Sequence, residues 1–169
     1  MRATAIAARP PVLDVGCVPG RLLAALRERG LPALGIDTSP LALCRADEVG
    51  VVLHRSVFAL LPLEGRWGTV LLLDGNVGIG GDPATLLRRA DALLGPAGRV
   101  LVELSPPGRA LRRVQARVEG AAGRGPWFPW AEVGSCSIGA LAGSAGLAVA
   151  ESWTCDGRWF AELIRLPTD

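Results

Sequence analysis

The sequence predicts an α/β fold, a three-layer sandwich in which helices cover both faces of a mainly parallel sheet. Short aliphatic runs alternate with longer stretches of helical periodicity along most of the chain, and the links between them are short and marked by glycine or proline. Near the end, two apolar runs are joined by a turn that contains Gly157. Two strands joined in this way are antiparallel, so we expect a seven-stranded sheet that closes with a C-terminal hairpin.

The expected elements follow one another in the order that right-handed crossovers require. The run from Thr69 to Leu73 is the most apolar, which predicts a central strand covered on both faces. Ser39 and Asp82 are capping residues followed by proline, and each predicts the start of a helix. The predicted strands are residues 12–15, 34–36, 51–53, 69–73, 99–104, 147–153 and 159–166, and the predicted helices are residues 20–29, 39–47, 82–94 and 133–145.

The 169 residues fit one domain, residues 1–169. After the fifth predicted strand the composition changes to proline, glycine and arginine over about residues 105–130. The alternation from Arg113 to Val118 within this stretch is typical of an exposed ribbon. We therefore expect an insertion that could cover a site.

Composition excludes several classes of protein. Half of the residues are apolar and a fifth are charged, which is typical of a globular chain. The net charge of +2 is carried by scattered arginines, so nucleic acid is not an expected partner. The four cysteines form no C-x-x-C pair and no apolar run is long enough to span a membrane, so we expect no metal site, no membrane span and a cytoplasmic protein. All basic residues except one histidine are arginine, a bias that suggests a GC-rich, actinomycete-like bacterial source.

The sharpest motif is the segment D-V-G-C-V-P-G, from Asp14 to Gly20, between a predicted strand and a predicted helix. Glycines at such a turn let a ligand approach the backbone, and the helix start offers free N–H donors. A dinucleotide-binding loop would need G-x-G-x-x-G, whereas only Gly16 and Gly20 are present here. The acidic Asp14 beside them suits a cationic ligand better than a phosphate.

This segment, with an acidic residue at the end of the second predicted strand, resembles motif I of class I S-adenosylmethionine (SAM)-dependent methyltransferases, which have a Rossmann-like fold. The resemblance covers roughly residues 12–104. It implies that Asp37 accepts hydrogen bonds from the two ribose hydroxyls, which matches the two oxygens of a carboxylate. The cofactor-binding residues that it implies are Asp14, Gly16, Cys17, Gly20, Asp37, Thr38, Ser56, Val57, Leu73, Asp74 and Gly75.

The residues that would act on the acceptor are less well marked. Asn76 follows the central strand in a glycine-rich loop, at the edge where open α/β sheets bind ligands. It could orient a substrate, and Glu103 and His54 are further candidates for a general base. Trp127 and Trp130 lie in the insertion, where they either line an apolar substrate pocket together with Asn76 or anchor the insertion.

The resemblance implies a methyltransferase that acts on a small molecule. Two alternatives remain open at this point. Val18 stands where the family usually has glycine, which favours a protein that binds SAM or its demethylated product without transferring a methyl group. Asp37 would also fit an NAD-dependent reductase. Because few residues precede the first predicted strand, we expect a second copy or a partner protein to cover the cofactor site.

Overall fold

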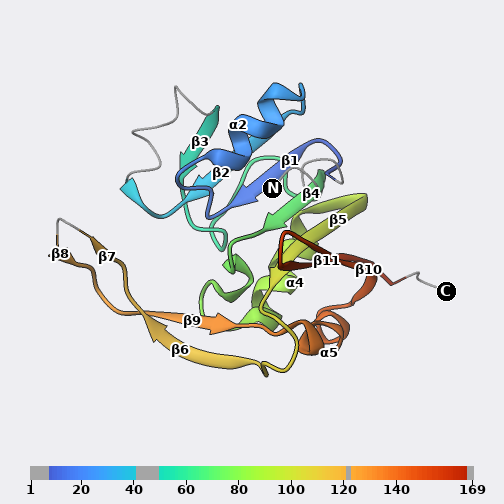
Figure 1. Cartoon of the computed structure of the whole chain (residues 1–169). Coiled ribbons are helices and arrows are strands. Elements are labelled where there is room, and N and C mark those ends of the chain that lie inside the picture. Colours follow the sequence, from blue (N-terminus) through green and yellow to red (C-terminus); the bar gives the residue numbers. More distant parts are fainter. Residues whose placement is uncertain (1–7, 41–49, 121–122, 167–169) are drawn as a thin grey trace.

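The structure is a computed structural model that describes residues 8–40, 50–120 and 123–166 (Figure 1). A seven-stranded sheet forms its centre, in the order β10-β11-β5-β4-β1-β2-β3. The five strands from β5 to β3 pair in parallel, whereas β11 pairs antiparallel with both β5 and β10. The predicted fold class is confirmed. The strands are β1 (Val12–Val15), β2 (Ala33–Asp37), β3 (Val51–His54), β4 (Trp67–Leu72), β5 (Leu94–Leu104), β10 (Leu147–Cys155) and β11 (Arg158–Arg165).

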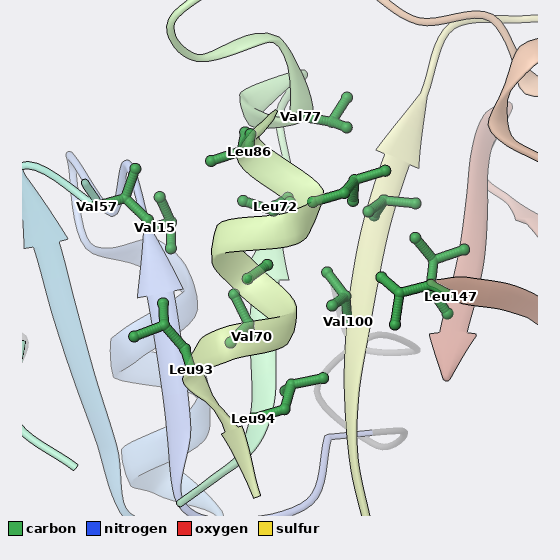
Figure 2. Packing of buried hydrophobic residues seen from close by; sticks show 14 of the residues in the cluster. Val15, Val57, Val70, Leu72, Val77, Leu86, Leu93, Leu94, Val100 and Leu147 are labelled. Carbon is green, nitrogen blue, oxygen red and sulfur yellow. The ribbon is translucent and has the colours of Figure 1, made fainter. Parts of the chain in front are cut away.

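Helices pack on both faces of the sheet. On one face, α4 (Pro83–Leu93) packs on the central strands and α5 (Ile138–Ser144) lies beside it against β10, and on the other face α2 (Arg21–Glu28) packs against β1 and β4. Figure 2 shows the first of these cores, where leucines of α4 point at valines and leucines of the sheet. Four apolar side chains of β4 are fully buried, as its apolar sequence predicted: Trp67, Val70, Leu71 and Leu72.

Two predicted boundaries differ from the structure by more than two residues. The expected helix 133–145 starts only at Ile138, after a 3-10 turn, η3 (Ser135–Ser137). Val133 and Ser135 instead form backbone hydrogen bonds with Ser105, which hold them extended. The link 95–98 between the predicted helix 82–94 and the predicted strand 99–104 is part of β5, because Leu94 already pairs with Trp67 and residues 95–98 form a bulge in the register. Of the expected helix 39–47, nearly all lies outside the described residues.

The hairpin that closes the sheet turns at Asp156 and Gly157, both of which have a positive φ, 51° and 73°. Such a two-residue turn matches the twist of its flanking strands. Because β11 runs antiparallel to β5, this turn lies at the edge where β5 ends. The hairpin therefore delivers Arg158, the first residue of β11, to the ligand-binding edge of the sheet.

The predicted insertion leaves the sheet as a two-stranded ribbon of β6 (Arg112–Ala116) and β9 (Phe128–Glu132), with β7 (Glu119–Gly120) and β8 (Gly123–Arg124) at its far end. Figure 1 shows it stretched out beside the sheet, beyond the carboxyl ends of the parallel strands. It is attached by two bridges, one between Trp130 and Ile79 and one between Gly134 and Ser105.

Candidate cofactor-binding site

The turn after β1, residues 14–20, is held against the end of β2 by its backbone. The amides of Gly16 and Cys17 both donate to the carbonyl of Ile36, at 2.9 and 3.2 Å. Gly16 and Gly20 have φ of 72° and 91°, which side chains disfavour. We call residues 14–20, the last two residues of β1 together with the turn that follows, the β1 turn.

Asp14 is the buried acid of this turn. Only 4% of the residue is exposed, yet its side chain lines a cavity, and no described residue donates a hydrogen bond to its carboxyl group. Burial, followed by the negative charges of Asp74 and Asp37, raises the pKa of Asp14 to about 7. A buried carboxylate without a partner is costly, so the site favours a ligand that brings positive charge.

Cys17 lies beside Asp14 but is not a nucleophile at neutral pH. Burial, followed by the charges of Asp14 and Asp37, raises the pKa of its thiol to about 12. The side chain packs with Leu23 and Val52. Its role is to fill space beneath the turn, as expected of a buried thiol with its proton.

Asp37 stands at the end of β2 and faces the β1 turn. Its Oδ2 accepts a hydrogen bond from the Val18 amide at 3.2 Å, and its Oδ1 accepts one from the Ser39 amide at 2.8 Å. Each oxygen keeps acceptor capacity for a ligand hydroxyl. Val18 therefore takes part in positioning the acid through its backbone, which a valine can do as well as a glycine.

The turn after β4, residues 73–79, meets the β1 turn through one side chain; we call it the β4 turn. The Asn76 Nδ2 donates to the carbonyls of Val15 and Gly16, at 2.8 and 3.1 Å. A Cβ on Gly16 would lie 2.5 Å from this nitrogen, which explains the glycine there. Asn76 thus joins the two turns, and the candidate role of its amide nitrogen in orienting a substrate gives way to this structural one.

Four charged side chains form a cluster at the same edge. The Arg158 Nε donates to Glu103 at 2.7 Å, and its Nη2 donates both to Glu103 and, at 2.6 Å, to Asp74. The Asp74 amide donates to Glu103 at 2.7 Å, and Arg21 lies 3.7 Å from the other Asp74 oxygen. Glu103 holds the pKa of Arg158 above its ordinary value. Glu103 is therefore engaged in an ion pair, which makes it a poor general base.

The cavity at this edge lies between the two turns and opens to solvent. It combines apolar side chains with acidic and basic ones. It is lined by Asp14, Gly16, Cys17, Val18, Pro19, Arg21, Leu22, Leu73, Asp74, Asn76 and Arg158.

Sequence reasoning found six of these residues and missed the rest. Arg158 is the important omission. The signal that could have found it is topological, because a turn between β10 and an antiparallel β11 must lie beside the end of β5. Arg21 is the first residue of α2 and directly follows the Asp14 to Gly20 motif, so the motif could have located it.

Other predicted site residues do not line the cavity. Val57 is buried in the core under α4, and the Ser56 hydroxyl accepts a hydrogen bond from the Phe58 amide. The exposed His54 donates its Nε2 proton to the Thr38 carbonyl, since a carbonyl can only accept. Gly20, Asp37 and Gly75 likewise lie outside the lining.

The two tryptophans of the insertion are also separate from the cavity. Trp127 is 60% exposed, and the Arg117 guanidinium lies over its ring at 4.5 Å. Trp130 is half-buried and meets the Phe128 ring edge-on at 6.0 Å. Both rings belong to the ribbon, in a structure that does not bring them to the cavity lining.

Comparison with known proteins decides the family. Residues 2–133 match the sequence profile of a methyltransferase domain. The chain belongs to this methyltransferase family. The family match confirms the resemblance to class I SAM-dependent methyltransferases that the Asp14 to Gly20 motif implied. A search of curated protein sequences finds no significant match.

Solved methyltransferases share the fold over nearly the whole chain. A SAM-dependent methyltransferase from Bacteroides fragilis, in complex with S-adenosyl-L-homocysteine (SAH), is 24% identical with a TM-score of 0.82, over 97% of this chain and 76% of that one. The CcbJ methyltransferase from Streptomyces caelestis is 18% identical with a TM-score of 0.73, over 99% and 89%. The sugar N-methyltransferase KedS8 from a Streptoalloteichus species is 20% identical with a TM-score of 0.69, over 97% and 84%.

Two absences concern the described residues. Within residues 8–40, 50–120 and 123–166, no group of three or more histidine, cysteine, aspartate or glutamate side chains is arranged to hold a metal ion. In the same part of the chain, no helix is long and apolar enough to span a membrane.

Proposed function

We propose that the methyltransferase domain binds SAM in the cavity between the β1 and β4 turns and transfers its methyl group to a small molecule. The observation that carries this proposal is Asp14, a buried carboxylate that lines the cavity and has no partner among the described residues. SAM carries a sulfonium and an ammonium group. Either positive charge would relieve the electrostatic cost of ionising Asp14.

The surrounding residues suit the rest of the cofactor. Gly16 and Gly20 give the β1 turn its left-handed bends beside the cavity, and Asp37 offers both oxygens to the ribose hydroxyls. Thr38, which follows Asp37, would flank the adenine. Ser56 and Val57 follow β3 farther along the same edge. We propose them as cofactor-binding residues too, although they do not line the cavity.

The chemistry asks little acid or base work of the chain. When bound, SAM supplies an activated methyl group that an acceptor nucleophile displaces from sulfur. The chain then has to bind the cofactor, align the acceptor behind the methyl group and exclude water. Both candidate bases are engaged, since Glu103 forms an ion pair and His54 donates a hydrogen bond to a carbonyl. A reaction that needs no general base agrees with this arrangement.

A small acceptor is supported by the structural neighbours, which include a methyltransferase solved with bound 1,6-didemethyltoxoflavin and a sugar N-methyltransferase. For this chain, the ribbon that carries Trp127 and Trp130 is the proposed wall of the acceptor site, completed by movement of the ribbon or by a second copy. We also propose that the protein is bacterial and cytoplasmic and that residues 1–169 form a single domain, as expected from the sequence.

Titration calorimetry with SAM, SAH and NAD tests the proposal. We expect dissociation constants in the micromolar range, about −8 kcal/mol, for SAM or SAH and no binding of NAD. Asp37→Ala should weaken binding at least tenfold, whereas the control Glu151→Ala, which removes an exposed carboxylate of β10, should bind like the unmodified protein. Absence of SAM and SAH binding, or equal binding of NAD, would contradict the proposal.

Methyl transfer itself is tested by mass spectrometry of candidate acceptors incubated with the protein and SAM. Transfer to any acceptor separates an enzyme from a protein that only binds the cofactor. Of the functions left open by the sequence, the family match favours the methyltransferase.

A further inference from the structure

We infer that Arg158 is a carboxylate-binding residue of this site, and that its Nη1 group receives a carboxylate carried by a ligand. That carboxylate belongs either to the amino-acid end of the cofactor or to the acceptor. The inference deepens the proposed function, since it assigns a role in the same cavity to a residue of the closing hairpin.

The guanidinium of Arg158 is only partly used by the protein. The Nε donates one hydrogen bond to Glu103, and the two Nη2 hydrogens go to Glu103 and Asp74. The Nη1 carries two further hydrogens, and they meet no acceptor in the described parts of the chain. Because Arg158 also lines the cavity, these two donors are available to a ligand there.

The protein holds this group in a fixed orientation. Glu103 engages two guanidinium nitrogens at once, and only 15% of its side chain is exposed. The Arg158 guanidinium also lies over the Phe160 ring, 5.5 Å from its centre. Because the protein already fixes one side of the guanidinium, the side chain loses little conformational entropy when a ligand binds to its other edge.

The charges around the cavity match a ligand that carries both signs. Asp14 and Asp74 contribute negative charge, and Arg21 and Arg158 contribute positive charge. An ammonium group near Asp14 and a carboxylate at Arg158 would each meet the opposite sign. A ligand with positive charge alone would leave the Nη1 donors unpaired.

The test compares variants that differ at Arg158 without leaving a buried charge behind. Arg158→Met alone would strand Glu103, so the informative pair is Glu103→Gln and the double variant Glu103→Gln with Arg158→Met. Arg27→Met is the matched control, since Arg27 is an exposed arginine at the far end of α2. Thermal unfolding of each variant confirms that it is folded.

Three probes separate the sources of the carboxylate. SAH and decarboxylated SAM, which lacks the carboxylate, are titrated by calorimetry. Benzoate is titrated by NMR into free and SAH-saturated protein, with the side-chain Nε–H signal of Arg158 as reporter, assigned by its absence from the double variant. A charge-assisted hydrogen bond predicts a loss of about 10- to 100-fold where the carboxylate is bound.

If the cofactor supplies the carboxylate, the double variant binds SAH 10- to 100-fold more weakly than Glu103→Gln does, with no change for decarboxylated SAM. If the acceptor supplies it, SAH affinity stays the same, and benzoate shifts the Arg158 signal in SAH-saturated protein and binds the double variant less. Unchanged SAH affinity together with an unmoved Arg158 signal would overturn the inference. Failure of the unmodified protein to bind SAH would instead contradict the proposed function, and benzoate added to free protein would still decide the role of Arg158.

Discussion

The β1 turn and the β4 turn lie side by side at the carboxyl ends of paired strands, and each contains an aspartate and a left-handed glycine. The two aspartates differ in burial and in their charged partners. Asp14 is 4% exposed and has no partner among the described residues, whereas the Asp74 side chain is 56% exposed and forms ion pairs with Arg158 and Arg21. The charge of Asp14 in the β1 turn is left for a ligand to balance, whereas the charge of Asp74 in the β4 turn is already balanced by arginines.

The largest expected effect is on the pH dependence of stability at Asp14. Its pKa in the folded chain, about 7, lies above the ordinary value of 3.8, so the folded chain keeps this proton after the unfolded chain has lost it. The free energy of unfolding should therefore fall between about pH 4 and pH 7 and level off above. Asp14→Asn should remove this fall and gain at most about 4 kcal/mol at pH 8, at 1.36 kcal/mol for each pKa unit.

Urea unfolding at a series of pH values measures this effect. Glu151→Gln removes an exposed carboxylate of β10 that does not contribute to the raised pKa of Asp14, so it serves as the control and should keep the slope of the unmodified protein. Parallel pH profiles for Asp14→Asn and the unmodified protein would mean that Asp14 is not the buried acid described above. The same titration predicts that a cationic ligand releases a proton on binding near pH 7, which calorimetry in buffers of different ionisation enthalpy detects.

The two glycines provide the second comparison. Gly16→Ala places a Cβ 2.5 Å from the Asn76 amide nitrogen at a φ of 72°, whereas Gly75→Ala meets nothing within 4 Å at a φ of 79°. Left-handed strain alone costs about 1 kcal/mol, so Gly75→Ala should lose that much. Gly16→Ala should lose about 3 kcal/mol, because Asn76 also gives up its hydrogen bonds. Denaturant unfolding measures both, and equal losses would argue against the close approach.

Asn76, which joins the two turns, should have an intermediate effect. Asn76→Ala leaves the carbonyls of Val15 and Gly16 without this donor and should lower the free energy of unfolding by about 2 kcal/mol. Asn76→Asp should lose more, since a carboxylate would face two carbonyl oxygens with Asp14 nearby. An Asp variant as stable as the Ala variant would show that the contact contributes little.

The smallest effect is expected at Asp74. Its ion pairs are largely exposed to solvent, so Asp74→Asn should change the free energy of unfolding by less than about 1 kcal/mol. Raising the salt concentration should reduce even this difference. A loss as large as that of Gly16→Ala would mean that the β4 turn depends on its charge as much as the β1 turn depends on its glycine.

These turns also show how far a sequence alone predicts such a site. Residues that act through the local backbone could be predicted, because the spacing of Asp14, Gly16 and Gly20 after an apolar strand is itself the signal. The mainly parallel sheet and its closing hairpin followed from apolar runs and short links for the same reason. The start of α5 could not be predicted, because the competing hydrogen bonds of Val133 come from Ser105, 28 residues earlier in the chain.

Side chains that meet across long distances in the sequence were placed less well. Glu103 was interpreted as a candidate base, but Arg158, 55 residues later, engages it. Asn76 was given a possible substrate contact, but its nitrogen binds carbonyls about 60 residues away. Local motifs do not contain the information about which partner such a polar group finds.

The attachment of the ribbon bears on how such a protein can diversify. The chain leaves the sheet after Ser105 and is back at Val133, whose carbonyl accepts a hydrogen bond from the Ser105 amide at 2.8 Å. The two ends of the intervening stretch are in contact with each other. Changes in its length therefore cost little loop entropy and do not alter the sheet register. The ribbon is in this sense a cassette, which evolution or an engineer can exchange to suit a new acceptor while the β1 turn stays as it is.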